Sequence, residues 1–259
     1  DHYFVNIGDC AGKLNPSGDL LFRYGKRIED NNLVSFGAFF EAEQLTRDST
    51  VPGGSICRQL FALFNLPEVI QKIKSNPKPP LLRDVWLGNE DLQLMTARDK
   101  KGSEKGLFVA AFGGHNAQSH NHNDVGNFIV YADGKPMLID VGVETYTAKT
   151  FSKRRYEIWT MQSAYHNLPT VNGVMQKAGR EFKAKNVKYE SNDDFAQLSV
   201  DISEAYPSDA GIKYWIRKVR LNRGKNIEII DSYELTTVNG KLMLSLITPC
   251  NVSEDTPGK

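Results

Sequence analysis

Apolar residues recur every three or four positions between about residues 30 and 75, which is the spacing of helices with one buried face. Asp30 and Asn31 precede the first of these runs and are suited to cap a helix. Pro67 fits the first turn of a further helix whose apolar residues begin at Val69. The pattern therefore predicts two or three core-facing helices.

From about residue 85 onward, the pattern changes to short strands and turns. Residues 195–202 alternate between apolar and polar side chains, as in a strand with one buried face. Asp133-Gly134 and Asn222-Arg223-Gly224 each separate two β-favouring runs and predict hairpins. Because no helical pattern separates the strands, they predict an antiparallel β-sandwich rather than alternating strands and helices.

A cluster of prolines at residues 77–80 interrupts the helical pattern before the first strands, and we expect a domain boundary there. The predicted fold is α+β, with helices in residues 1–80 and a large antiparallel β-sandwich in residues 81–259. The chain opens on Asp1 rather than Met and stops without a clear ending, so we expect it to be a piece of a longer protein.

The composition narrows the classes of partner. With 259 residues, 40% of them hydrophobic, the chain can build a substantial core without the help of disulfide bonds. A formal charge of +1 gives no general attraction to nucleic acid or to a membrane surface. Three widely spaced cysteines imply no disulfide framework. No apolar run approaches the roughly 18 residues of a membrane span, so we predict neither a nucleic-acid partner nor a membrane span.

Histidines and carboxylates gather in one part of the sequence. The run Ser119-His120-Asn121-His122-Asn123-Asp124 carries two histidines, which should point the same way if the segment is extended. Asp140 closes an apolar run, where a partly buried charge needs a partner or a cation. One histidine of this pair, Asp140 and His166 would together give a His, Asp, His site with room for a fourth ligand. That donor set favours zinc over calcium.

Simpler interpretations stay open for each of these residues. Asp140 can cap the turn that leads to Gly142, and His166 can be an ordinary core or surface histidine. Metal-dependent cupins also carry a His-x-His pair in a β-fold, but the glutamate expected four residues further on is Gly126 here. A ligand set without one of its members fits a specified metal geometry poorly, which disfavours a cupin.

Three motifs in a fixed order resemble the C-terminal half of the heparinase II/III-like polysaccharide lyases. They are Phe112-Gly113-Gly114-His115 leading through residues 119–124 to Asn127-Phe128, then Leu138-Ile139-Asp140-Val141-Gly142, then Tyr165-His166-Asn167 followed by Val171-Asn172-Gly173. The resemblance is strongest over residues 85–180. It implies that the N-terminal helices are the last ones of the family's α/α toroid and that the rest is its β-sandwich.

The resemblance also implies roles for individual residues. His122, Asp140 and His166 would bind zinc, with the metal mainly ordering the central loops, and His120 would be the catalytic residue that reaches the substrate. The family's reaction is β-elimination, in which a base removes the C5 proton of a uronic acid and an acid protonates the departing O4. Polar donors must neutralise the substrate carboxylate for this proton to leave, and an imidazole can serve as the base.

Tyr146, Arg154 and Arg155 resemble the aromatic and basic loop that covers the family's cleft, and an arginine can hold two oxygens of a carboxylate or sulfate. A solvated basic turn is the alternative. The implied partner is an anionic polysaccharide or oligosaccharide, with heparin or heparan sulfate ahead of alginate. The implied location is periplasmic or secreted, and a homodimer is compatible with the resemblance.

The family's catalytic tyrosine and its carboxylate-neutralising residue would lie before Asp1. Tyr3 is the only tyrosine near that end, and we assign it no role. We therefore expect this piece alone to be inactive or nearly so. The alternative function is a non-catalytic, zinc-stabilised β-sandwich that binds carbohydrate or is purely structural.

Overall fold

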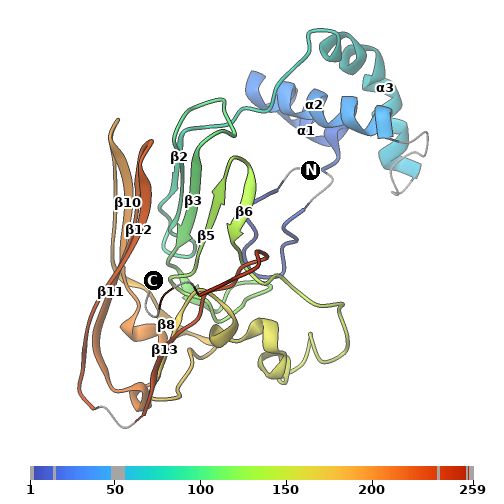
Figure 1. The fold of residues 1–259 in the computed structure, drawn as a ribbon. Helices are drawn as coiled ribbons and strands as arrows, with labels where there is room; N and C mark the ends of the chain where they lie inside the picture. The colour runs from blue at the N-terminus through green and yellow to red at the C-terminus, as the bar shows by residue number, and fades with distance from the viewer. Residues whose placement is uncertain (1–2, 14–15, 48–55, 238–239, 255, 257–259) are drawn as a thin grey trace. The chain divides into compact units, whose positions relative to one another are not determined.

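The computed structural model describes residues 3–13, 16–47, 56–237, 240–254 and 256. The chain forms two compact units (Figure 1). Leu14–Leu81 make up the smaller unit, whereas Asp1–Lys13 and Leu82–Lys259 together make up the larger one. This differs from the division expected from the sequence, because the first 13 residues belong to the unit that contains the sheets.

The described part of the smaller unit contains three helices: α1 (Gly18–Arg27), α2 (Asn31–Arg47) and α3 (Ile56–Ile73). Asp30 caps α2 as predicted, since its Oδ1 accepts the backbone N–H groups of Asn32 at 2.8 Å and Leu33 at 3.1 Å. The expectation that a separate helix begins at Pro67 is wrong, because α3 continues through it. Val69, beyond the proline, is buried in the core of the unit. Within the described residues, no helix is both long and apolar enough to span a membrane.

The larger unit is an antiparallel β-sandwich, as predicted, and its two sheets lie face to face (Figure 1). The first sheet has the order β1 (Asp84–Leu87), β2 (Leu94–Arg98), β3 (Leu107–Phe112), β5 (Phe128–Ala132) and β6 (Lys135–Leu138). The second has the order β12 (Asn226–Leu235), β11 (Ile212–Asn222), β10 (Phe195–Asp201) and β9 (Lys185–Ser191). Two further ribbons pair β13 (Leu242–Leu244) with β7 (Pro169–Val171), and β4 (His115–Asn116) with β8 (Gly179–Lys183).

The inner faces of the two sheets share one apolar core. Ala196 and Leu198 of β10 are buried, as the alternation in the sequence predicts, and they pack against Met95, Val109 and Phe128 of the first sheet. The predicted turn between β5 and β6 is also confirmed. Asp133 and Gly134 have φ values of 51° and 73°, which match the positive φ that a tight hairpin requires at both central positions.

The N-terminal segment covers the outer face of the first sheet. Tyr3, Val5 and Ile7 pack against the apolar side chains of that face, and the Tyr131 hydroxyl donates to the Phe4 carbonyl at 3.3 Å. The first sheet is therefore apolar on both sides. This packing is the reason that residues 1–13 belong to the larger unit.

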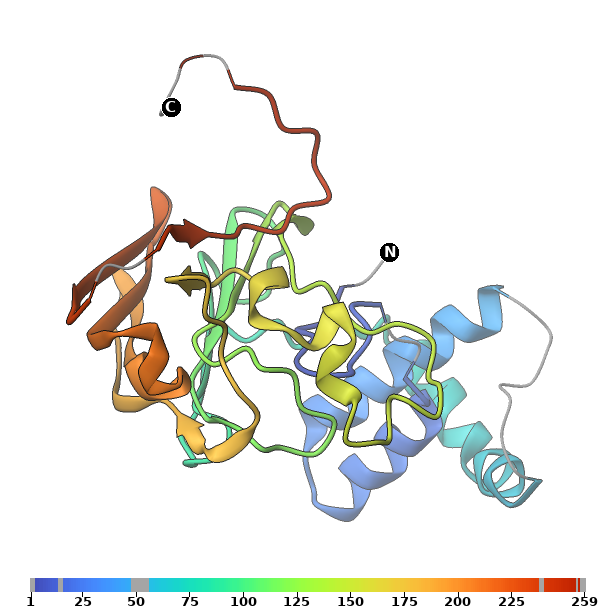
Figure 2. The same cartoon turned by 90° about the horizontal axis from the view of Figure 1, so that it is seen from below.

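A long connection between β6 and β7 lies at one end of the sandwich (Figures 1 and 2). It contains three short 3-10 turns, η1 (Arg155–Glu157), η2 (Trp159–Met161) and η3 (Ser163–Tyr165). Arg217 of β11 reaches this end, where it donates to the carbonyls of Gly126 at 3.1 Å and Asn167 at 2.6 Å. It also forms a two-pronged ion pair with Asp231 of β12, at 2.8 and 2.7 Å.

We expect Arg217→Ala to lower the free energy of unfolding by about 3–5 kcal/mol, because it leaves the partly buried Asp231 carboxylate and two loop carbonyls without their donor. Arg217 has no exposed surface, so water cannot replace it without entering the core. Urea denaturation measures the change. Lys218→Ala, at an exposed position of the same strand, is the matched control and should change stability little. Equal effects of the two substitutions would contradict the assignment.

Candidate functional site

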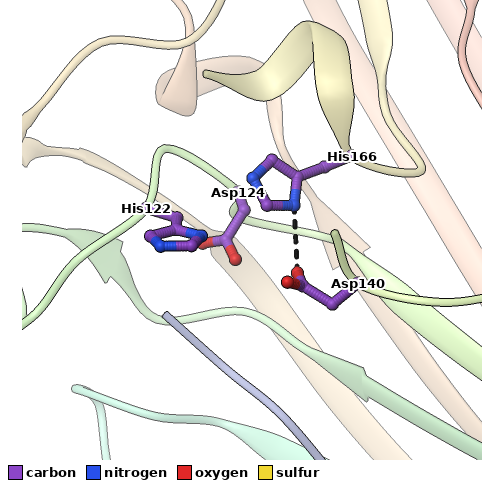
Figure 3. A group of neighbouring side chains, drawn as sticks. All are labelled: His122, Asp124, Asp140 and His166. Carbon is purple, nitrogen blue, oxygen red and sulfur yellow. Dashed lines mark hydrogen bonds and ion pairs between the residues drawn. The ribbon is translucent and has the colours of Figure 1, made fainter. Parts of the chain in front are cut away.

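Four buried side chains meet at the end of the sandwich that carries the long connection. They are His122, Asp124, Asp140 and His166 (Figure 3), and each offers a ligand atom that lies within 4.8 Å of the others. Three of these residues were predicted as ligands. Asp124 was not, although its position two residues after His122 was a usable signal, because alternate residues of an extended segment face one side.

The extended segment that was expected to point His120 and His122 the same way is not present. His120 has a φ of 57°, in the left-handed region, so the two-residue alternation of a strand does not hold there. The His122 side chain is completely buried, whereas that of His120 is 53% exposed. One histidine thus faces the interior cluster and the other is accessible to a large molecule.

Two buried atoms of the cluster have no hydrogen-bond partner among the described residues: Nδ1 of His122 and Oδ2 of Asp124. Buried polar atoms are nearly always paired in proteins, so two unpaired ones in the same cluster point to a ligand that binds both. Imidazole nitrogen and carboxylate oxygen are common ligands of transition metals. The four residues therefore fit a metal ion.

Asp140 and His166 form the charged centre of this cluster. His166 Nδ1 lies 3.0 Å from Asp140 Oδ2 (Figure 3). Its Nε2 lies 3.1 Å from the Thr160 carbonyl. Burial would lower the pKa of His166, but the charge and hydrogen bond of Asp140 outweigh it and raise the pKa to about 9. The same partnership lowers the pKa of Asp140 against the effect of burial.

The other carboxylate has no such partner. Burial raises the pKa of Asp124 to about 8 against the opposing charge of His166, and the nearby charge of Asp140 acts in the same direction as burial. Asp140 also caps the turn that leads to Gly142, which was its simpler interpretation, since its Oδ1 accepts the N–H of Gly142 at 2.7 Å. Capping a turn and joining the cluster are therefore compatible, because each role uses a different carboxylate oxygen.

Two asparagines with no exposed surface tie the loops of the cluster together. Asn127 donates to Asp140 Oδ2 at 2.8 Å and accepts the backbone N–H of Asn167 at 3.0 Å. Asn167 in turn donates to the carbonyls of Phe128 at 2.7 Å and Ile139 at 3.0 Å. The positions of Asp140 and His166 are thus fixed by amide hydrogen bonds as well as by their own ion pair.

Sequence reasoning missed Asp9, which contacts both histidines of the pair. Its Oδ1 lies 3.0 Å from His122 Nε2 and 2.6 Å from Arg155, and its Oδ2 lies 3.0 Å from His120 Nδ1 and 2.9 Å from the Tyr146 hydroxyl. Burial alone would raise the pKa of Asp9, but these hydrogen bonds outweigh it and lower the pKa to about 2. Asp9 lies more than 100 residues before the pair, so no local pattern marks it.

The three residues predicted to bind substrate lie in different settings. Tyr146 is exposed, and its ring is stacked on that of His120 at 6.2 Å between centroids. Arg154 is exposed and pairs with Glu157 at 2.8 Å. Arg155 is mostly buried, and besides Asp9 it donates to the carbonyls of Asn121 and Thr150. The structure therefore brings Tyr146 and Arg155 to the histidine pair through Asp9, whereas the ion pair of Arg154 is solvated.

A small cavity of about 30 Å³ adjoins both the cluster and the exposed histidine. Its lining includes Gly8, His115, His120, His122 and Asp124.

The family model described as "Heparinase II/III-like, C-terminal" matches residues 100–242, more than half of the chain. The chain belongs to this family. The resemblance carried by the three sequence motifs is thereby confirmed. No curated protein matches the chain significantly.

Solved structures of heparinases share the fold of this family member. The heparan sulfate lyase HepC from Pedobacter heparinus is similar over 90% of this chain, with 16% identity and a TM-score of 0.59. A heparinase III structure is similar over 92% of this chain, with 15% identity and a TM-score of 0.57. The chain spans 30% of the first of these proteins and 31% of the second. The predicted α+β fold is confirmed.

The neighbouring arginines provide a matched test of the site. We expect Arg155→Ala to lower the free energy of unfolding by about 1.5–3 kcal/mol, because it removes a charged donor from Asp9 and from two loop carbonyls. Arg154→Ala removes a solvated ion pair and should leave stability close to that of the unsubstituted protein. Thermal and urea unfolding of both variants measure the difference. A larger effect of Arg154→Ala would contradict this account.

Proposed function

We propose that this chain is the C-terminal portion of a zinc-containing polysaccharide lyase that cleaves uronic-acid polysaccharides by β-elimination. The observation that carries the proposal is an exposed histidine, His120, that lies beside a buried His/Asp cluster in a member of the heparinase II/III-like family. Because the chain spans about 30% of the lyases that share its fold, the proposal concerns a protein that also contains the remaining catalytic groups.

We propose zinc as the metal and His122, Asp140 and His166 as its ligands, with Asp124 as the fourth. Two imidazoles and two carboxylates suit four-coordinate zinc better than calcium, which prefers a larger set of oxygens. All four residues are at most 5% exposed. A metal held there would order the loops around residues 120–127 and 139–142, away from direct contact with a polymer.

His120 is the proposed catalytic residue of this chain. As a base, its imidazole would take the C5 proton of a uronic acid, the released electron pair would form the C4–C5 double bond, and the glycosidic O4 would leave with a proton from an acid. The hydrogen bond from its Nδ1 to Asp9 leaves Nε2 for this step. Tyr3, which packs against Tyr131 at 5.8 Å, receives no role.

The proposed substrate is a glycosaminoglycan, with heparin or heparan sulfate ahead of alginate. The support is the likeness to a heparan sulfate lyase and two exposed side chains of the long connection that can contact an anionic sugar. Tyr146 offers an exposed ring for stacking and Arg154 an exposed guanidinium for a carboxylate or sulfate. Arg155 was also predicted to bind substrate. It would do so only if its guanidinium bound the substrate and Asp9 at the same time.

Two further parts of the proposal come from the family. The smaller unit would belong to an α/α toroid, in agreement with the apolar side chains that α3 leaves exposed, such as Phe64 at 77%. A lyase acting on extracellular polymers would be periplasmic or secreted.

The second candidate function is a non-catalytic, zinc-stabilised β-sandwich that binds carbohydrate or is purely structural. The depth of the cluster favours it, because a completely buried metal can stabilise loops without taking part in a reaction. It predicts metal binding without elimination, even when the rest of the protein is present.

Metal analysis of the purified protein tests the zinc site. We expect about one zinc ion per chain, and a large loss of zinc in His122→Ala, because one ligand in four disappears. His120→Ala is the matched control, two residues away and outside the cluster, and should keep its zinc. Absence of zinc from the unsubstituted protein, or equal losses in the two variants, would contradict the site.

An elimination assay tests the lyase. We expect the longer protein that contains this chain to release unsaturated uronate products from heparan sulfate, detected by their ultraviolet absorbance. In His120→Ala the rate should fall by about 10²–10⁴-fold while zinc is retained. The 259 residues alone should show little turnover. Zinc-loaded longer protein without activity on any uronate polymer would favour the second candidate function.

A further inference from the structure

Asp9 contacts both histidines of the site, although it is neither a proposed metal ligand nor the proposed catalytic residue. Its side chain is only 3% exposed, and both carboxylate oxygens accept hydrogen bonds from histidines. One of these histidines, His122, is a proposed metal ligand, and the other, His120, is the proposed residue that faces the substrate. A single carboxylate thus connects the buried cluster with the exposed imidazole.

The tautomer of His122 follows from this contact. An ionised carboxylate can only accept, so the nitrogen that faces Asp9, Nε2, must carry the hydrogen in neutral His122. The other nitrogen, Nδ1, then presents a lone pair, and it is one of the two buried atoms of the cluster without a hydrogen-bond partner.

His120 is fixed by the second oxygen of the same carboxylate. Its Nδ1–H donates to Asp9 Oδ2, and no hydrogen bond joins its Nε2 to any described residue. The backbone supports the arrangement, since the Asp9 N–H donates to the His120 carbonyl at 3.2 Å. Gly8 allows this close approach, because a Cβ at that position would clash with the same carbonyl oxygen.

We propose that Asp9 is a positioning residue that orients both histidines at once. One oxygen turns the Nδ1 lone pair of His122 toward the metal cluster, and the other leaves Nε2 of His120 for the substrate. Arg155 and Tyr146 complete the arrangement, because both donate hydrogen bonds to the same carboxylate and hold it in place. The inference rests on the proposed zinc site and on the proposed role of His120, and it adds the group that links them.

The experiment combines zinc affinity with the tautomers of the histidines. Competition with a chromophoric chelator gives the affinity, and two-bond ¹H–¹⁵N correlation spectra of the metal-free protein distinguish Nδ1–H from Nε2–H rings. Five histidines in the chain make the spectra tractable. We expect Asp9→Asn, whose amide has one acceptor oxygen, to weaken zinc binding by about 10–100-fold and to give a mixture of tautomers at His122 or His120.

Asp91→Asn is the matched control. Asp91 also accepts from a histidine, His115 at 2.9 Å, and from an arginine, Arg180 at 2.8 Å, but it contacts no residue of the cluster. It should leave zinc affinity and the spectra of His120 and His122 unchanged. Thermal unfolding verifies that both variants are folded, and Asp9→Asn keeps the shape of the side chain to limit disruption.

Two results would overturn the proposal. One is an Nδ1–H tautomer of His122 in the unsubstituted metal-free protein, which needs no variant to observe. The other is a folded Asp9→Asn protein with unchanged zinc affinity and unchanged histidine spectra. An unsubstituted protein that binds no zinc would refute the metal site instead, and the spectra would still decide whether Asp9 orients the two rings.

Discussion

Burying ionisable groups at the end of a β-sandwich is the constraint on which the rest of this structure depends. Asp124, Asp140 and His166 lie out of contact with water, where an unpaired charge costs several kcal/mol. Much of the surrounding polar structure offsets that cost, through amides that hydrogen-bond Asp140 and an ion pair between Asp140 and His166. The unpaired atoms that remain, on His122 and Asp124, are the ones a metal ion would use.

The strands could be predicted because their signals are local. Alternation in residues 195–202 and the Asp133-Gly134 turn each specify a strand or hairpin within a few residues, and both are observed. Helix α1 was missed because it is short and buries only one large apolar side chain, Phe22, beside Gly18 and Gly25. A Cβ at Gly37 of α2 would clash with the backbone of Phe22 in α1, so the two helices approach through a glycine rather than through a long apolar stripe.

The site shows the same contrast between local and distant signals. His122, Asp140 and His166 belong to motifs that resemble one family, and these three do meet. Asp9 could not be predicted, because its contacts with the histidine pair span more than 100 residues. The different exposure of His120 and His122 also escaped prediction, since the left-handed backbone at His120 breaks the two-residue alternation of an extended segment. Arg155 resembled a substrate-binding residue by its type, but the structure shows its guanidinium hydrogen-bonded to a buried carboxylate.

The position of Asp9 bears on how the larger unit is assembled. Its segment precedes the helices in the chain, yet Tyr3, Val5 and Ile7 pack on the first sheet and Asp9 reaches both histidines. The sandwich is therefore built from two stretches of chain, with the helical unit inserted between them. A polypeptide that began at Leu82 would have all four residues of the metal cluster, but neither the cover of the first sheet nor the carboxylate that holds His120 and His122. The site belongs to the larger unit as a whole rather than to the histidine motif alone.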